Sequence, residues 1–147
     1  MSLDVYLKVD EPLVHRGTGV FIRDGGKTKE LTPDEVLDRW PDADVSYSQT
    51  VSDVAYTANI THNLNSMAEA AGIYKELWRP DELGLTKAKE LIAPLEAGFI
   101  KLVTKPENFT KYNPENGWGT YDGLVEFVKN YLVACQTYPE SRIEVSR

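Results

Sequence analysis

The chain has 147 residues, of which 41 % are hydrophobic, and its 23 acidic and 16 basic side chains give a net charge of -7 with histidine neutral. This length predicts one domain with a packed core, and the acidic balance argues against binding to duplex nucleic acid, which requires a basic face. The single cysteine, Cys135, excludes an internal disulfide framework and is typical of a reducing compartment.

The first thirty residues indicate strands. Apolar and polar side chains alternate over residues 3–9, which is the period of a half-buried strand. A second strand is expected over residues 15–23. The Asp-Gly-Gly-Lys sequence at 24–27 predicts a hairpin turn, because glycine adopts positive φ at no steric cost, and residues 28–31 would form the return strand.

A short acidic helix is expected next. Thr32 supplies an N-cap hydroxyl, Pro33 presets the first helical φ, and Glu35 completes a capping box. Its apolar side would carry Val36, Leu37 and Trp40, and Pro41 would end it. The range 34–53 contains six acids and one base, and three of the acids are candidate contacts to a partner with a basic surface: Asp38, Asp42 and Asp44.

The remainder of the chain indicates mostly helices. We expect a strand, three helices and a closing strand, at 51–60, 64–71, 86–104, 121–135 and 142–146. Pro94 should kink or split the long middle helix. Because strands come mostly first and helices mostly second, the predicted fold class is α+β, with a largely antiparallel sheet and about three helices packed on one face.

A single α+β domain over residues 1–147 is predicted, with 10–50 as a hairpin and acidic insertion. The other face of the sheet would be hydrated or would pair with a second subunit, so a homodimer is left open. The first residues carry no secretion signal, and no apolar run is long enough to span a membrane, so we expect a cytoplasmic protein that has no membrane partner.

Three strings of residues resemble a family of small proteins from bacteria and phages. They are Ala-Asn-Ile-Thr-His-Asn-Leu at 58–64, Leu-Trp-Arg-Pro at 77–80 and Asn-Gly-Trp-Gly-Thr-Tyr at 116–121. The resemblance covers residues 51–147 and the opening strand. It implies an accessory protein of the cytosol, of bacterial or phage origin, and it transfers no catalytic role to any residue.

His62 and Asn63 form the first candidate ligand site. They lie where a strand meets a helix, and the free N–H groups of a helix N-terminus attract anions. A histidine there can act as a general acid or base near neutral pH. The alternative, which we favour, is that the asparagines around His62 only cap the helix.

The loop before the last helix is the second candidate site. Trp118 stands between two glycines and could place an aromatic face over a base or sugar, with Asn116 as a polar contact and Tyr121 beside it. Alternatively, Trp118 closes the end of the core. Arg79 is a third candidate, because guanidinium binds carboxylate or phosphate, although pairing with Asp81 or Glu82 at the surface is the favoured interpretation.

The sequence predicts neither a metal site nor a cofactor. The two histidines, His15 and His62, are separated by 46 intervening residues, and no zinc-type or phosphate-cradling motif occurs. Cys135 lies on the apolar stripe of the last helix, as an inert core thiol does. We therefore favour a non-catalytic module that binds a protein partner. The alternative is a small enzyme or nucleotide-type ligand binder with a pocket around His62 and Trp118.

Overall fold

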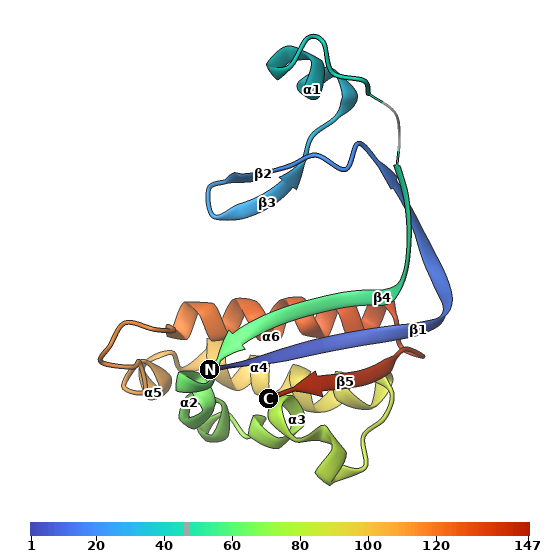
Figure 1. The fold of residues 1–147 in the computed structure, drawn as a ribbon. Coiled ribbons are helices and arrows are strands. Elements are labelled where there is room, and N and C mark those ends of the chain that lie inside the picture. Colours follow the sequence, from blue (N-terminus) through green and yellow to red (C-terminus); the bar gives the residue numbers. More distant parts are fainter. Residues whose placement is uncertain (46–47) are drawn as a thin grey trace. The chain divides into compact units, whose positions relative to one another are not determined.

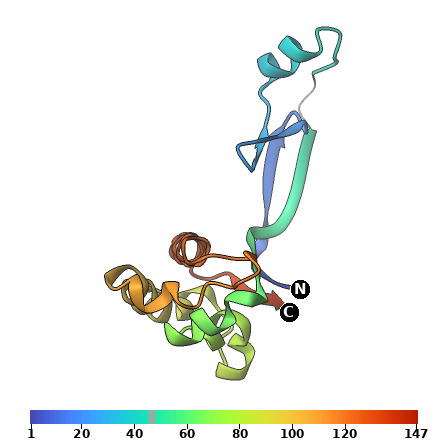
Figure 2. The ribbon, with the colours of Figure 1, turned by 90° about the vertical axis from the view of Figure 1, so that its left-hand side faces the viewer.

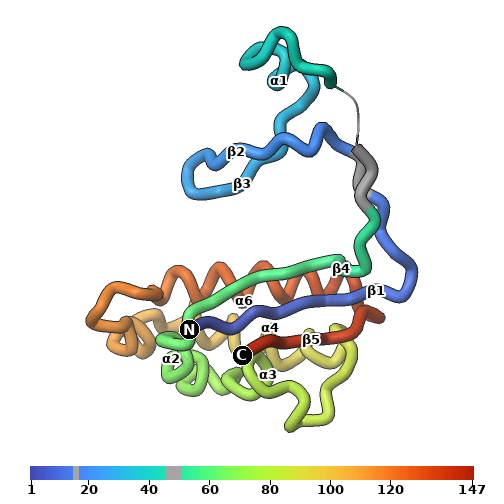
Figure 3. Tube along the Cα trace, in the orientation of Figure 1, coloured from blue at the N-terminus to red at the C-terminus, as the bar shows by residue number. Residues whose placement is uncertain are grey.

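The computed structural model describes residues 1–45 and 48–147, with the side chains of residues 15–16 and 48–50 outside the description (Figures 1 and 3). The strands are β1 (Ser2–Gly17), β2 (Phe21–Asp24), β3 (Lys27–Glu30), β4 (Ser48–Thr61) and β5 (Arg142–Ser146). The α-helices are α1 (Pro33–Arg39), α2 (Asn65–Ala70), α3 (Tyr74–Trp78), α4 (Ile92–Thr104), α5 (Glu107–Thr110) and α6 (Tyr121–Thr137). Three short 3₁₀ helices are η1 (His62–Leu64), η2 (Pro80–Leu83) and η3 (Ala88–Leu91).

These elements form two compact units. The larger unit comprises residues 1–11 and 53–147, and the smaller unit comprises residues 12–52. Each unit has its own hydrogen bonds and its own pattern of burial, described in turn below.

The larger unit is built on an antiparallel sheet of strand order β4-β1-β5, in which Val5 of β1 lies opposite Val145 of β5. Leu3, Val5 and Leu7 are fully buried, whereas the polar residues between them are partly exposed. Figure 2 shows the helices on one side of this sheet, with α6 seen nearly end-on. The α+β class and the one-sided helical layer expected from the sequence are confirmed.

The helical layer is held together by leucines and by one close approach. Leu91, Leu95 and Leu102, on η3 and α4, are fully buried, and so is Leu124 on α6. A Cβ on Gly98 of α4 would lie 2.4 Å from Cγ2 of Ile73, so only glycine lets the helix approach the turn before α3 this closely.

The opposite face of the sheet carries polar side chains that bond to one another. Asn59 Nδ2 donates to Ser2 Oγ (2.8 Å) and to Asp4 Oδ1 (2.7 Å), and Lys8 pairs with Glu144 at 2.8 Å. The alternating pattern in β1 thus separates an apolar inner face of the sheet from a polar outer face. A polar outer face favours the expectation that this face is hydrated over the expectation that it pairs with a second subunit.

The smaller unit contains the β2–β3 hairpin and α1. Gly25 and Gly26 form its turn with positive φ values of 58° and 80°. The backbone N–H of Glu35 donates to Thr32 Oγ1 (3.3 Å), so the predicted capping box is present. Lys29 pairs with Glu35 at 2.9 Å and, as the largest cause, lowers the pKa of that carboxyl.

Two sequence expectations need correction. The strand expected over residues 15–23 is divided: residues 15–17 end β1 (Ser2–Gly17), whereas residues 21–23 belong to β2 (Phe21–Asp24), which follows the positive-φ Gly19 (72°). Leu37 and Trp40 are exposed, and of the apolar residues expected along α1 only Val36 is buried. By contrast, the split expected within 86–104 is present, since η3 (Ala88–Leu91) precedes α4 (Ile92–Thr104). Pro94 lies in the first turn of α4, where backbone N–H groups need no partner within the helix.

A fully buried tyrosine lies between α6 and β4. Tyr131 is fully buried, stacks on Tyr56 with ring centroids 5.9 Å apart, and meets Phe127 edge-on at 5.9 Å. Its hydroxyl has no hydrogen-bond partner among the described residues. Burial raises the pKa of this phenol, and burial also raises the pKa of the nearby Cys135 thiol to about 12, consistent with an inert core cysteine.

Replacing Tyr131 by phenylalanine should therefore stabilise the protein. Removing a desolvated hydroxyl that makes no hydrogen bond relieves a penalty of about 1 kcal/mol. The matched control is Tyr121→Phe, which loses the 2.6 Å hydrogen bond from Tyr121 Oη to the Leu102 carbonyl and should destabilise by about 1 kcal/mol. Urea unfolding of both variants measures the two signs. Equal destabilisation by both substitutions would show that the Tyr131 hydroxyl has a partner.

Candidate functional site

His62 is held by an indole from another element. It begins η1 directly after β4, where Thr61 caps the turn by accepting the Asn63 backbone N–H at 3.3 Å. Nε1–H of Trp78, a residue that is 2 % exposed, donates to Nδ1 of His62 at 2.8 Å. Because Nδ1 accepts, the neutral imidazole carries its proton on Nε2. The strings at 58–64 and 77–80 therefore meet in space.

The loop at 116–121 reaches the same place. Asn63 Nδ2 donates to the Trp118 carbonyl at 3.3 Å, although the two residues are 55 positions apart. The backbone N–H of Trp118 donates to Asn116 Oδ1 at 3.0 Å. Both polar backbone atoms of Trp118 are thus bound within the protein, and the two predicted junctions come together at one end of the sheet. We call His62, Asn63, Trp78 and Trp118 the junction cluster.

The indole of Trp118 points out of the protein. Its side chain is 71 % exposed, so it does not close the core as the alternative interpretation proposed. The glycines on either side have positive φ, 74° at Gly117 and 101° at Gly119. This backbone geometry presents an exposed aromatic ring on a main chain that is fixed by hydrogen bonds.

Tyr121 and Asn116 hold the loop in place. Tyr121 donates its hydroxyl to the Leu102 carbonyl, and its backbone N–H donates to Asn113 Oδ1 at 2.8 Å. Thr120 caps α6 by accepting the Gly123 N–H at 3.0 Å. These groups form hydrogen bonds within the loop and to α4. The polar atoms of Asn116 and Tyr121 in these bonds, which the ligand hypothesis assigned to recognition, are therefore engaged inside the protein.

Arg79 is engaged by its own neighbours. Its Nη1 pairs with Glu82 at 2.9 Å, and its Nε–H donates to Tyr74 Oη at 3.4 Å. The hydrogen bonds to Tyr74 and then to Glu82 raise the pKa of the guanidinium. The surface ion pair that the sequence favoured for Arg79 is therefore present, with Glu82 as its partner. Asp81, the other predicted partner, pairs instead with Arg147 at 2.9 Å.

Sequence reasoning missed three residues of this region. Trp78 orients His62, Tyr74 stacks on Trp78 with ring centroids 5.5 Å apart, and Arg147 donates to the Trp78 carbonyl at 3.0 Å. No periodic pattern or local motif signals these contacts. The N- and C-termini of the chain lie close together, as Figure 3 shows, because Asp4 of β1 pairs with Ser146 of β5.

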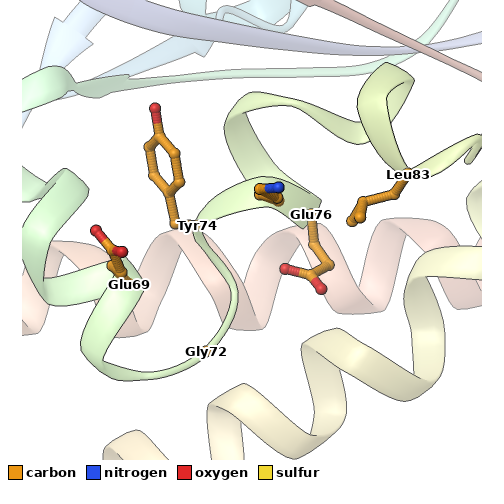
Figure 4. A pocket seen from close by; sticks show the side chains of 6 residues that line it. Glu69, Gly72, Tyr74, Glu76 and Leu83 are labelled. Carbon is orange, nitrogen blue, oxygen red and sulfur yellow. The ribbon is translucent and has the colours of Figure 1, made fainter.

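The larger unit also has surface hollows away from His62 and Trp118. One of about 240 Å³ lies beside α3 and the turn at Gly72, and Figure 4 shows Glu69, Tyr74 and Glu76 around it. Another of about 370 Å³ lies at the end of α4 and includes Ile100 and Phe109. These hollows are lined by residues other than those that the sequence selected for a ligand pocket.

The candidate partner-binding acids lie in the smaller unit. Asp38, Asp42 and Asp44 are all exposed. Six large apolar side chains of the same unit are exposed as well: Leu13, Val14, Phe21, Leu37, Trp40 and Val51. The buried apolar side chains among those described in residues 12–52 are Leu31 and Val36. This unit therefore places most of its large apolar side chains on its surface.

Within residues 1–45 and 48–147, no three His, Cys, Asp or Glu side chains gather as a metal site requires. The side chain of His15 lies outside the described residues. None of the described helices is both long and apolar enough to cross a bilayer. Comparison of the chain with protein-family models, with curated proteins and with solved structures gives no match.

Alanine at Gly119 should destabilise the protein more than alanine at Gly117. Both glycines have positive φ, which costs other residues about 1–2 kcal/mol. A Cβ on Gly119 would also lie 2.7 Å from Thr61 Cγ2 and 2.9 Å from Leu64 Cγ, whereas a Cβ on Gly117 meets nothing within 4 Å. Overpacking adds about 1–3 kcal/mol. Thermal unfolding should rank the wild type first, Gly117→Ala second and Gly119→Ala last, and equal Tm values for the two variants would contradict the close approach.

Proposed function

We propose that the protein is a non-catalytic accessory protein of the cytoplasm that binds a protein partner through its smaller unit. The observation that carries this proposal is the exposure of apolar side chains over residues 12–52, where Phe21 is 57 % and Trp40 50 % exposed. A unit of this size rarely buries enough surface to be stable alone, and clustered exposed apolar groups mark interaction sites. The resemblance to small bacterial and phage proteins favours an accessory role.

The charges around these apolar groups favour a basic partner surface. Asp38, Asp42 and Asp44 lie on or just after α1, near Leu37 and Trp40 in the chain, and all three are exposed. Complementary charge at the rim of an interface speeds association and selects among partners, and an apolar or aromatic centre supplies most of the affinity. The smaller unit carries both components.

Affinity capture from a lysate of the native host tests the proposal. The Leu37→Ser/Trp40→Ser variant should lose the partner that the wild type retains, because removing an aromatic anchor costs about 2 kcal/mol or more, which is over tenfold in affinity. Asp38→Asn/Asp42→Asn/Asp44→Asn should weaken capture most at low salt.

The matched control is Val133→Ser. Val133 lies on α6 in the larger unit and is 51 % exposed, nearly the same as Trp40, so its replacement should leave capture unchanged. Capture that is equal for the wild type and every variant would contradict a role for the smaller unit.

A second candidate function is favoured by Trp118. Its fixed main chain and exposed ring suit stacking on a base or sugar, as the ligand-binding hypothesis proposes. The polar atoms nearest to it are partly used inside the protein, so this candidate ranks below the binding module.

A thermal-shift screen of nucleotides, sugars and amino acids tests this second function. A ligand at about one hundred times its Kd adds about 2.7 kcal/mol, which raises Tm by several degrees for a domain of this size. We expect any such shift to disappear in Trp118→Ala and to persist in Trp40→Ala, whose indole is exposed in the smaller unit. A shift that survives Trp118→Ala would place the ligand elsewhere.

A further inference from the structure

The hollow at the end of α4 has an apolar floor and a basic side. It is lined by Ile100, Lys101, Thr104, Lys105, Asn108 and Phe109 and measures about 370 Å³. Ile100 is 53 % exposed, so apolar surface remains open to solvent in the hollow. We call these six residues the α4–α5 groove.

Both lysines of the groove are available to an acidic partner. Lys101 lies in the last turn of α4 and Lys105 is its C-cap residue, and both side chains line the same hollow. Neither forms an ion pair with any residue that the structure describes. In a chain of net charge -7 this is a local basic site.

Helix α1 carries the complementary pattern. Asp34 and Asp38 are also four residues apart, are exposed, and form an acidic strip. Leu37 on this helix and Trp40 at its C-cap are exposed apolar side chains close to these acids in the chain. Exposed apolar side chains close to two acids thus match an apolar groove flanked by two lysines.

We infer that α1 of one copy of this chain occupies the α4–α5 groove of a second copy. The inference rests on the proposed function, because it uses the smaller unit as the binding element, and it names the partner. Each copy has one helix and one groove, so two copies can exchange helices reciprocally and close the assembly as a symmetric dimer. Charge complementarity is the reason for choosing a second copy: the acidic segment requires a basic apolar surface, and this chain carries one.

Sedimentation equilibrium of the purified protein, from micromolar to millimolar concentration, tests the inference. The wild type should change from the 16.5 kDa monomer to twice that mass, and more readily at low salt. Lys101→Glu/Lys105→Glu and Asp34→Lys/Asp38→Lys should each bring like charges together and weaken dimerisation at least about tenfold.

Mixing the two charge-reversed variants gives the decisive result. In the mixed pair an acidic helix faces a basic groove and a basic helix faces an acidic groove, so the dimer mass should return. This rescue also shows that both variants fold. If circular dichroism shows that either variant is unfolded, Asp34→Asn/Asp38→Asn and Lys101→Gln/Lys105→Gln replace them, and each should weaken the dimer without rescue on mixing.

Several outcomes would overturn the inference. A monomer at every concentration excludes self-association, and so does a dimer that persists unchanged in both reversed variants, because its interface would then lie elsewhere. Failure of rescue by two folded variants excludes the helix-to-groove pairing. A wild-type monomer that nevertheless captures another protein through Leu37 and Trp40 would overturn this inference and leave the proposed function standing.

Discussion

Leu3, Val5 and Leu7 are fully buried against the helices of the larger unit, and the polar residues between them face the other way. Burying such side chains contributes about 1.5–3 kcal/mol each, relative to leaving them in water. Because β1 is the central strand, its single apolar face decides on which side the helices pack and which face of β4 and β5 turns inward. The position of every candidate residue in this unit follows from that arrangement.

The junction cluster is one consequence. The end of β4 delivers His62 and Asn63 to the edge of the sheet, and α6 begins beside them after the loop that carries Trp118. The buried indole of Trp78 fixes the tautomer of His62, while Asn63 fixes the main chain of Trp118. The ring of Trp118 is the most exposed side chain of the cluster at 71 %, Asn63 is also exposed, and His62 is partly exposed.

The two units differ in how they use apolar residues. The larger unit encloses its leucines and aromatic rings in one core, whereas the smaller unit buries Leu31 and Val36 and leaves Phe21 and Trp40 at the surface. Hydrogen bonds at the N-terminus of α1, and the ion pair between Lys29 and Glu35, define the local structure of the smaller unit without an extended core. This difference in burial is the observation on which the proposed binding role of the smaller unit rests.

The sequence by itself determined the elements whose cause is local. Alternation over 3–9 indicated β1, and the hydroxyl of Thr32 indicated the start of α1; each signal depends on residues within a few positions of one another. The order of these local elements along the chain then indicated the α+β class. Only the tertiary structure decided that Trp78 bonds His62, that Asn63 bonds Trp118, that Arg147 rather than Arg79 pairs with Asp81, and that Trp118 points outward. Those contacts join residues far apart in the chain, so they exist only once the packing of β1 against the helices has brought the residues together.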